Sequence, residues 1–210
     1  MAEYLSAAQV GVQLDVSRET LERLEVYVGL LLKWQRAINL IGPGTVADVW
    51  GRHVLDCGQL MRYIPRDKAP VVDIGSGAGL PGLVLAIMGV PNVKLVESNS
   101  RKCNFLREAA RMTKAPVEIV ESRVDHLQNM VAGVVTARAL APLSKLIELS
   151  QSVTSPNTIY LFLKGKDLKN ELTHLNNNWR LNWEVHPSLT NPDGSILKME
   201  SVARVITAHD

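Results

Sequence analysis

The fold of this chain is decided by the stretch Val71-Val72-Asp73-Ile74-Gly75-Ser76-Gly77-Ala78-Gly79-Leu80-Pro81-Gly82. Its first four residues are mostly β-branched and apolar, as a buried parallel strand requires. Three alternating glycines then allow a sharp turn and a close approach of the backbone to a ligand. Pro81 suits the first turn of a helix. The stretch therefore predicts a strand, a ligand-binding turn and a helix whose positive end faces a polar or anionic ligand.

Two cofactors fit this turn, in different registers. Residues 77–82 match G-x-G-x-x-G, the dinucleotide fingerprint, and Glu97 follows at about the spacing of its ribose-binding acid. That register leaves Asp73 buried without a role. The register from Asp73 to Gly79 lets the carboxylate accept backbone N–H groups or face a cationic ligand. This second pattern resembles that of Rossmann-like methyltransferases that use S-adenosylmethionine (AdoMet), so AdoMet is favoured over a nicotinamide cofactor.

Composition fits one domain of ordinary size with an extension, because the chain has 210 residues of which 46% are apolar. No apolar run is long enough for a membrane span, and the first residues lack the pattern of a signal peptide. Cys57 and Cys103 form no CxxC motif, so we expect no disulfide, no metal site and a cytoplasmic location. The net charge of +2 excludes a chain that binds nucleic acid through charge alone.

The chain is expected to divide into an N-terminal helical extension, residues 1–68, and an AdoMet-binding methyltransferase core, residues 69–210. Ser17 is the expected N-cap of a long amphipathic helix that ends near Gly42, and a second helix is expected from about Thr45 to Tyr63. Strands and helices then alternate, which predicts a parallel sheet with helices on both faces. The expected strands are 71–74, 92–97, 117–120, 133–137, 158–163, 180–185 and 196–207.

The tail predicts an antiparallel hairpin around the turn 190–194, which is how the seven-stranded methyltransferase sheet ends. The predicted fold class is therefore α/β, a Rossmann-like class I AdoMet methyltransferase. It would have a seven-stranded, mostly parallel sheet with an antiparallel C-terminal strand.

Ligands of parallel sheets bind beyond the carboxyl ends of the strands. The first strand presents the loop Gly75–Gly79, and the second presents Glu97, whose carboxylate can take both hydroxyls of a ribose. Residues 121–125 follow the third strand, where backbone groups and Asp125 can contact an adenine edge. Arg138 follows the fourth, where a cofactor carboxylate or an RNA phosphate would lie.

Motifs along nearly the whole chain match one family. They are Ile38-Asn39-Leu40, Arg52-His53-Val54-Leu55-Asp56, residues 72–82, Glu97-Ser98 with Lys102 and Phe105-Leu106, Glu121-Ser122-Arg123-Val124-Asp125, Thr136 with Arg138-Ala139, and Leu163-Lys164-Gly165. On these residues the chain resembles the bacterial small-subunit ribosomal RNA guanine-N7 methyltransferases, once called glucose-inhibited division protein B. Ala78 and Cys57 depart from the proline and serine common in that family, and neither departure changes a residue that we expect to bind the cofactor.

The resemblance implies AdoMet-dependent methylation of N7 of one guanine in the 530 loop of 16S ribosomal RNA, position 527 of that RNA. The implied partner is 16S rRNA or the small ribosomal subunit, without membrane or metal, and we expect a monomer. Arg138, His53 and Lys164 are candidates for positioning the substrate, with Asp56 beside them. The cofactor-binding residues that we expect are Asp73, Gly75, Gly77, Gly79, Leu80, Glu97, Val124, Asp125 and Arg138.

The chemistry of this reaction agrees with motifs that the chain lacks. Residues 136–142 contain no Asn/Asp-Pro-Pro-aromatic loop of the kind used on exocyclic adenine nitrogens. Cys57 and Cys103 lie in predicted helices, away from the strand ends where a nucleophile for pyrimidine C5 would be needed. Guanine N7 has an in-plane lone pair and no proton, so positioning alone can drive its methylation, supplying on the order of 7–11 kcal/mol.

Three other interpretations stay open on the sequence. An AdoMet methyltransferase acting on a small molecule or a protein would share the glycine loop and Glu97. An NAD-dependent dehydrogenase would use the other register of the loop. A non-enzymatic RNA assembly factor could keep AdoMet as a structural ligand.

Overall fold

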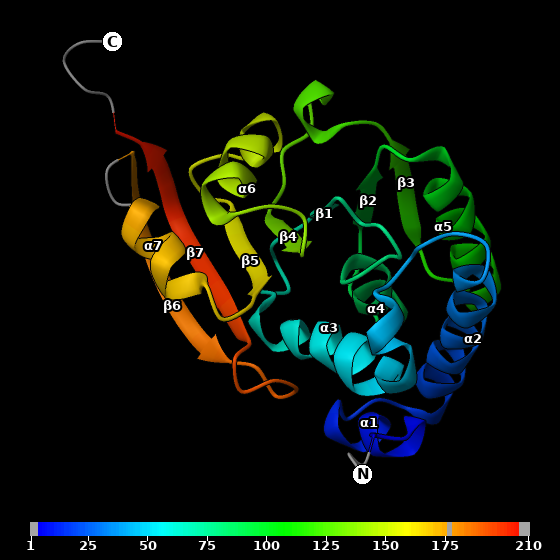
Figure 1. Ribbon diagram of the computed structural model, residues 1–210. Coiled ribbons are helices and arrows are strands. Elements are labelled where there is room, and N and C mark those ends of the chain that lie inside the picture. Colours follow the sequence, from blue (N-terminus) through cyan, green and yellow to red (C-terminus); the bar gives the residue numbers. More distant parts are fainter. Residues whose placement is uncertain (1–3, 176–177, 206–210) are drawn as a thin grey trace.

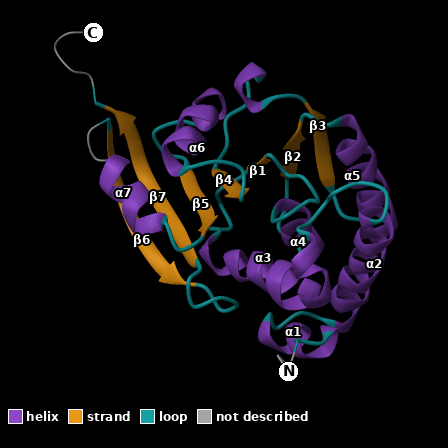
Figure 2. Cartoon of the chain, in the orientation of Figure 1, coloured by secondary structure: helices purple, strands orange, loops and turns teal. Residues whose placement is uncertain are grey.

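A seven-stranded sheet runs through the centre of the computed structural model, which describes residues 4–175 and 178–205 (Figures 1 and 2). The strand order is β3-β2-β1-β4-β5-β7-β6. Strands β1 to β5 are parallel, and β7 is antiparallel to both β5 and β6. The strands are β1 (Val71–Ile74), β2 (Val93–Glu97), β3 (Val117–Glu121), β4 (Val134–Arg138), β5 (Ile159–Lys164), β6 (Trp179–Pro187) and β7 (Ser195–Arg204). The predicted α/β sheet with an antiparallel end is confirmed.

Alternate residues of the central strands enter two separate apolar cores. Val71 packs on one face of the sheet, and Val72 and Ile74 pack on the other, as the two-residue period of a strand requires. The first face is covered by α2 (Arg18–Gln35), α4 (Gly82–Ile87) and α5 (Ser100–Thr113), and the second by α6 (Leu143–Ser150) and α7 (Leu168–Leu175). The sheet is therefore the middle of three layers (Figure 2).

The first long helix is shorter than the sequence predicts. Ser17 caps α2 through a hydrogen bond from the Thr20 N–H, as expected, but α2 ends at Gln35 rather than near Gly42. The Gln35 amide explains this end, because its Oε1 accepts from the N–H groups of Leu40 and Ile41 at 2.8 and 3.0 Å. This side chain folds the following loop back and holds Leu40 and Ile41 close to the end of α2.

The expected helix from Thr45 to Tyr63 is a series of short helical turns rather than one α-helix. They are η1 (Pro43–Asp48), η2 (Trp50–Leu55), α3 (Asp56–Gly58) and η3 (Gln59–Tyr63), and a further helix, α1 (Ala7–Gln13), precedes α2. Short turns η4 (Val124–His126) and η5 (Gln151–Val153) follow β3 and α6. Leu24 and Tyr27 of α2 share one core with Leu83 and Phe105. The division at residue 68 stays a prediction.

Within 4–175 and 178–205, no helix is long and apolar enough to cross a membrane. Within the same ranges, no group of three or more His, Cys, Asp and Glu side chains is arranged to hold a metal ion.

Candidate active site

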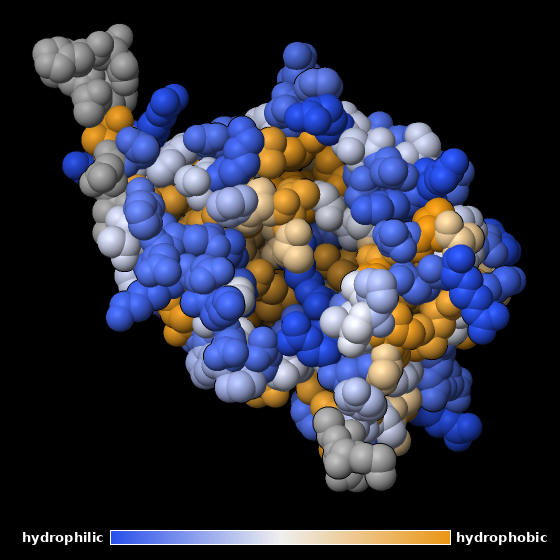
Figure 3. All heavy atoms as spheres, viewed as in Figure 1, coloured by the Kyte–Doolittle hydropathy of each residue, from blue (hydrophilic) through white to orange (hydrophobic). Residues whose placement is uncertain are grey.

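A cavity of about 440 Å³, here called the first cavity, opens at the carboxyl ends of the strands from β1 to β4. The strand order reverses between β1 and β4, which is where open α/β sheets bind ligands. The volume suits a small molecule. Figure 3 shows apolar residues in the central hollow of this face, bordered by hydrophilic ones. The apolar lining includes Leu40, Ile41, Leu80, Val124, Leu140 and Leu149.

The loop after β1 requires its glycines for different reasons. Gly75, Gly77 and Gly79 have φ angles of +65°, +56° and +83°, which favour glycine. A Cβ on Gly75 would lie 2.6 Å from the Leu140 side chain, whereas one on Gly77 would meet only a backbone oxygen at 3.8 Å. A Cβ on Gly79 would lie 2.6 Å from that of Leu83. Gly75 and Gly77 therefore line the cavity, and Gly79 lies behind it against α4.

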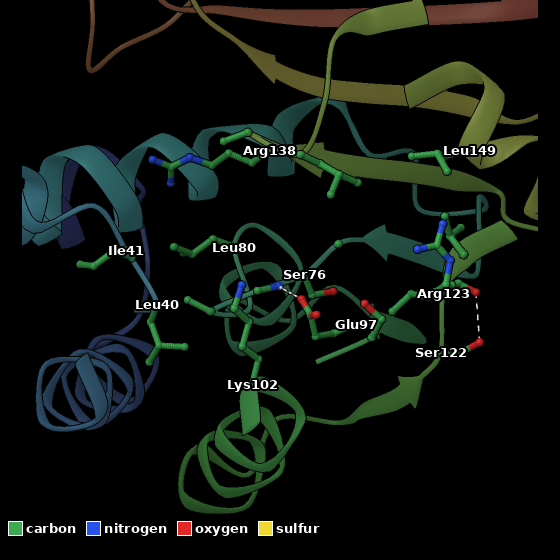
Figure 4. A pocket seen from close by; sticks show the side chains of 18 of the residues that line it. Leu40, Ile41, Ser76, Leu80, Glu97, Lys102, Ser122, Arg123, Arg138 and Leu149 are labelled. Carbon is green, nitrogen blue, oxygen red and sulfur yellow. Dashed lines mark hydrogen bonds between the residues drawn. The ribbon is translucent and has the colours of Figure 1, made fainter. Parts of the chain in front are cut away.

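Glu97, at the end of β2, holds the glycine loop. One carboxylate oxygen accepts from the Gly77 N–H at 2.9 Å and the other from the Asn99 N–H at 2.8 Å. Glu97 is 8% exposed and lines the first cavity, as Figure 4 shows. Each carboxylate oxygen has a further lone pair. Glu97 can therefore keep the loop in place and still accept two hydroxyl groups of a ribose.

Asp73 lies beneath the loop rather than in the cavity. It is fully buried, its Oδ1 accepts from the Thr136 hydroxyl at 2.8 Å, and its Oδ2 has no partner among the described residues. Burial raises the pKa of this carboxyl to about 6, although the Thr136 hydrogen bond lowers it in part. The N–H of Gly77 in the loop donates to Glu97 and not to Asp73. Asp73 therefore supports the loop from behind.

Tyr27 ties the N-terminal helices to the glycine loop. Its hydroxyl, fully buried in α2, donates to the Ala78 carbonyl oxygen at 2.8 Å. Burial raises the pKa of this phenol well above its ordinary value. Nothing in the local sequence around Tyr27 indicates this contact, since its partner lies far along the chain.

Arg138, at the end of β4, is held by residues of η2 and α3. Its guanidinium donates to the Arg52 carbonyl oxygen at 2.7 Å and to Cys57 Sγ at 3.3 Å, and its Nε lies 3.6 Å from Asp56 Oδ2. We expected Cys57 to lie away from the strand ends, and this was wrong, because its Sγ contacts Arg138 at the end of β4. Burial raises the pKa of the Cys57 thiol to about 12, so it stays protonated and is no nucleophile at neutral pH.

His53 lines the first cavity but is mostly buried. Its Nε2 lies 2.8 Å from the Thr45 hydroxyl, which itself donates to the Gly42 carbonyl oxygen at 2.7 Å. The only hydrogen of the Thr45 hydroxyl is thus donated to Gly42. The hydrogen between Thr45 and His53 therefore belongs to His53 Nε2, which donates to the Thr45 oxygen. Burial, followed by the charges of Arg138 and Arg52, lowers the pKa of His53 to about 3. The imidazole is therefore neutral at physiological pH.

The third strand end contributes Val124 and Asp125 to the lining, as expected. Asp125 pairs with Arg123 at 3.0 Å, and this hydrogen bond lowers the pKa of the Asp125 carboxyl. Two residues that we did not expect as cofactor contacts, Ser76 and Lys102, also line the cavity. In Figure 4, Lys102 and Leu40 lie on one side of the cavity and Arg138 on the other.

Lys164 lies in a neighbouring cavity of about 310 Å³, here called the second cavity. Its ammonium group is 2.6 Å from Glu171 Oε2, which also accepts from the Leu143 N–H at 2.6 Å. Arg138 and Ala139 line both cavities. The structure therefore brings Arg138 and His53 to the expected cofactor contacts and places Lys164 on the other side of Arg138.

Comparison with known proteins assigns this site to a family. Residues 20–195 match the family described as rRNA small subunit methyltransferase G. The chain belongs to this family. A member from Paramagnetospirillum magneticum is 51% identical over 189 residues, covering 90% of this chain and 92% of the relative. One from Rhodospirillum centenum is 47% identical over 188 residues, covering 90% and 87%. The predicted family, and with it an AdoMet-dependent methyltransferase, is confirmed.

Solved structures confirm the predicted fold. A ribosomal protein L11 methylase from Lactobacillus delbrueckii superposes with a TM-score of 0.59 at 14% identity, covering 71% of this chain and 79% of that one. M. jannaschii TYW2 in complex with AdoMet superposes with a TM-score of 0.57 at 14% identity, covering 81% and 80%. At these identities the likeness shows the Rossmann-like methyltransferase fold.

Proposed function

We propose that this chain methylates N7 of a guanine in the 530 loop of 16S rRNA, with AdoMet as the methyl donor. The family supplies the reaction class and the cofactor. The observation that carries the proposal is the first cavity, where the Gly75–Gly77 backbone and Glu97 meet on one side and Arg138 lies on the other.

The residues present suit AdoMet, which supplies a methyl group on an electrophilic sulfonium. Glu97 has free lone pairs for the ribose hydroxyls, and Gly77 leaves open space where a side chain would otherwise project. Arg138 offers a cation for a carboxylate at the other side of the cavity. Apolar side chains such as Leu80 and Val124 border the space between these groups and exclude water.

Methylation at N7 needs alignment rather than proton transfer. The N7–CH₃ bond forms as the S–CH₃ bond breaks, and the positive charge passes from sulfur to the imidazole ring of the base, with S-adenosylhomocysteine as the second product. No proton leaves the guanine. The protein holds the two reactants in line and keeps water out.

The side chains around Arg138 agree with this chemistry. His53 is neutral and engaged with Thr45, and Cys57 is a buried, protonated thiol. Neither is suited to serve as a nucleophile or as a charged acid at neutral pH. N7 of guanine is an acceptor that requires neither role.

The site also favours an exposed guanine as substrate. N7 lies on the major-groove edge of the base, which is inaccessible in the deep groove of A-form RNA. A loop nucleotide, turned out of its stack, presents that edge.

We propose that the chain acts as a monomer in the cytoplasm on 16S rRNA, either free or within the small subunit.

The test is methyl transfer from labelled AdoMet to 16S rRNA and to small subunits that lack the modification. Borohydride reduction followed by aniline cleavage cuts RNA at N7-methylguanine. We expect one cut, in the 530 loop. AdoMet binding without label on RNA in either form would overturn the proposal in favour of a small-molecule or protein substrate.

A further inference from the structure

The proposed reaction requires room for two ligands, and the first cavity accounts for one of them. Its lining joins the glycine loop, Glu97 and residues 122–125, which together suit a nucleoside with its attached amino acid. The second cavity has no established occupant. It adjoins the first, and the two share only Arg138 and Ala139 in their linings.

We propose that the second cavity receives the target guanine, with N7 turned toward Ala139 and O6 beside Arg138. This inference rests on the proposed function and deepens it, because it names the place and orientation of the base.

The walls of the second cavity suit a base that enters from outside. They come from six segments of the chain, which are residues 52–56, the end of β4 with the loop after it, α6, the end of β5 with the loop after it, α7 and the hairpin turn at residues 191–195. The volume of about 310 Å³ lies in the range of small-ligand sites. An added Cβ on Gly165 would meet nothing within 4 Å, so this wall is open.

Next to Arg138, a small side chain, Ala139, stands between the two cavities. Ala139 is exposed and has a φ of +50°, a left-handed conformation that non-glycine residues rarely adopt. Such conformations cost free energy and collect at functional sites. Here the turn lets the chain pass between the cavities with only a methyl group projecting. An atom in one cavity can therefore approach an atom in the other across Ala139.

Arg138 supplies the discrimination between guanine and adenine. A guanidinium has five N–H groups. Two of those of Arg138 donate to Cys57 Sγ and to the Arg52 carbonyl oxygen, and its Nε faces Asp56 Oδ2 in an ion pair at 3.6 Å. The other two N–H groups have no hydrogen-bond partner within residues 4–175 and 178–205. O6 of guanine lies next to N7 and accepts hydrogen bonds, whereas adenine carries an amino donor there. When N7 of the base faces Ala139, the Arg138 N–H groups can therefore donate to O6 of guanine. The amino group of adenine at the same position is itself a donor, and Arg138 would repel it.

Asp56 keeps this arrangement in place. Its Oδ1 accepts from the Ser188 and Thr190 hydroxyls at 3.1 and 2.8 Å, and its Oδ2 faces Arg138. One carboxylate thus fixes both the guanidinium and the hairpin turn that closes the cavity. Its negative charge also lies near the base that becomes positive on methylation, which Coulomb attraction favours.

The test fills the second cavity without touching the first. Gly165→Phe places a ring in the open space, and Ala141→Phe fills the same cavity from the loop after β4. Gly29→Phe, on the exposed face of α2 with nothing within 4 Å of an added Cβ, is the matched control. Three quantities are measured: the AdoMet dissociation constant by calorimetry, the single-turnover methyl transfer, and the fluorescence of 2-aminopurine placed next to the target guanine, which rises when the target leaves its stack.

We expect both cavity variants to bind AdoMet within twofold of the wild type, to transfer methyl at least a hundredfold more slowly, and to lose the fluorescence rise. Gly29→Phe should match the wild type in all three. Methyl transfer within threefold of the wild type by both cavity variants would overturn the inference while leaving the proposed function standing. Loss of AdoMet binding in both would also overturn it, because the cavities would not be separate sites. A wild type that labels no RNA would defeat the proposed function itself.

Discussion

The two cavities lie side by side but differ in the side chains and chain segments that line them. The first is bounded largely by backbone and apolar side chains, with fewer charged groups, among them Glu97, Lys102 and Asp125, and most of it comes from the segments directly after β1, β2 and β3. The second is lined by many charged groups, among them Arg52, Asp56, Lys164 and Glu171, and its lining comes from six separate parts of the chain. The proposed cofactor site is therefore built mainly from loops that are close in sequence, whereas the proposed substrate site depends on the tertiary fold.

Arg138 belongs to both cavities, so its removal should have the largest effect. Arg138→Ala is expected to slow single-turnover methyl transfer at least a hundredfold, because misplacement of reactants at such a site costs about that factor. Arg18→Ala, which removes an exposed arginine paired with Glu22 on α2, is the control. A rate within threefold of the wild type would show that neither cavity depends on Arg138.

Asp73 tests how the first cavity is supported from beneath. Its folded-state pKa of about 6 exceeds the ordinary value of 3.8, so the folded state binds more protons between these values. The wild type should therefore lose stability as the pH rises from about 4 to 6. Asp73→Asn removes this loss and should raise the free energy of unfolding at pH 7.5 by about 2–3 kcal/mol.

Urea denaturation of the unliganded protein at pH 4.5 and 7.5 measures the effect of Asp73→Asn. Asp193→Asn, on the exposed hairpin turn, is the control. A gain in stability that is the same at both pH values would contradict the assignment of the raised pKa to Asp73.

Gly75 tests whether the first cavity depends on the conformation of its backbone. Gly75→Ala places a Cβ 2.6 Å from Leu140 at a positive φ, and we expect the AdoMet dissociation constant to rise about tenfold, as a positive φ alone costs roughly 1 kcal/mol. Gly75→Ala combined with Leu140→Ala should recover part of the loss by relieving the contact. Gly29→Ala, in open space on α2, should leave calorimetric binding unchanged. Equal binding by Gly75→Ala and the wild type would rule out the close approach of ligand to this loop.

His53 should show the smallest effect. Burial and two arginines lower its pKa to about 3, so the methyl-transfer rate should show no inflection between pH 6 and 7. His53→Gln can retain the contact with Thr45 and should change the rate at most threefold. An inflection near pH 6.5 that disappears in His53→Gln would mean that the imidazole is charged in the complex.

Local sequence was enough for the parts of the fold that depend on near neighbours. Val71 to Gly79 predicts β1 and its turn, because strand burial and positive φ angles leave a direct signature. Ser17 likewise predicts the start of α2. The end of α2 was missed, since it depends on the Gln35 side chain binding backbone of the loop beyond it.

Contacts between distant segments could not be predicted in the same way. No periodicity links Tyr27 to Ala78, or Asp56 to Ser188 and Thr190. The prediction placed Glu97 correctly in the cavity but could not show that it also takes the Gly77 N–H. Whether the expected site residues bind AdoMet stays a prediction for the measurements above.

The hydroxyl of Tyr27 has a consequence for the N-terminal helices. It joins α2 to the glycine loop that we expect to contact the cofactor, so any ligand that orders the loop also stabilises α2 by thermodynamic linkage. Occupancy of the site should therefore slow amide hydrogen exchange in α2, and removing α2 should weaken cofactor binding even though α2 itself lies outside the cavity. The helices before the sheet are thus part of the binding equilibrium, and an isolated sheet domain would be a poorer receptor for the same ligand.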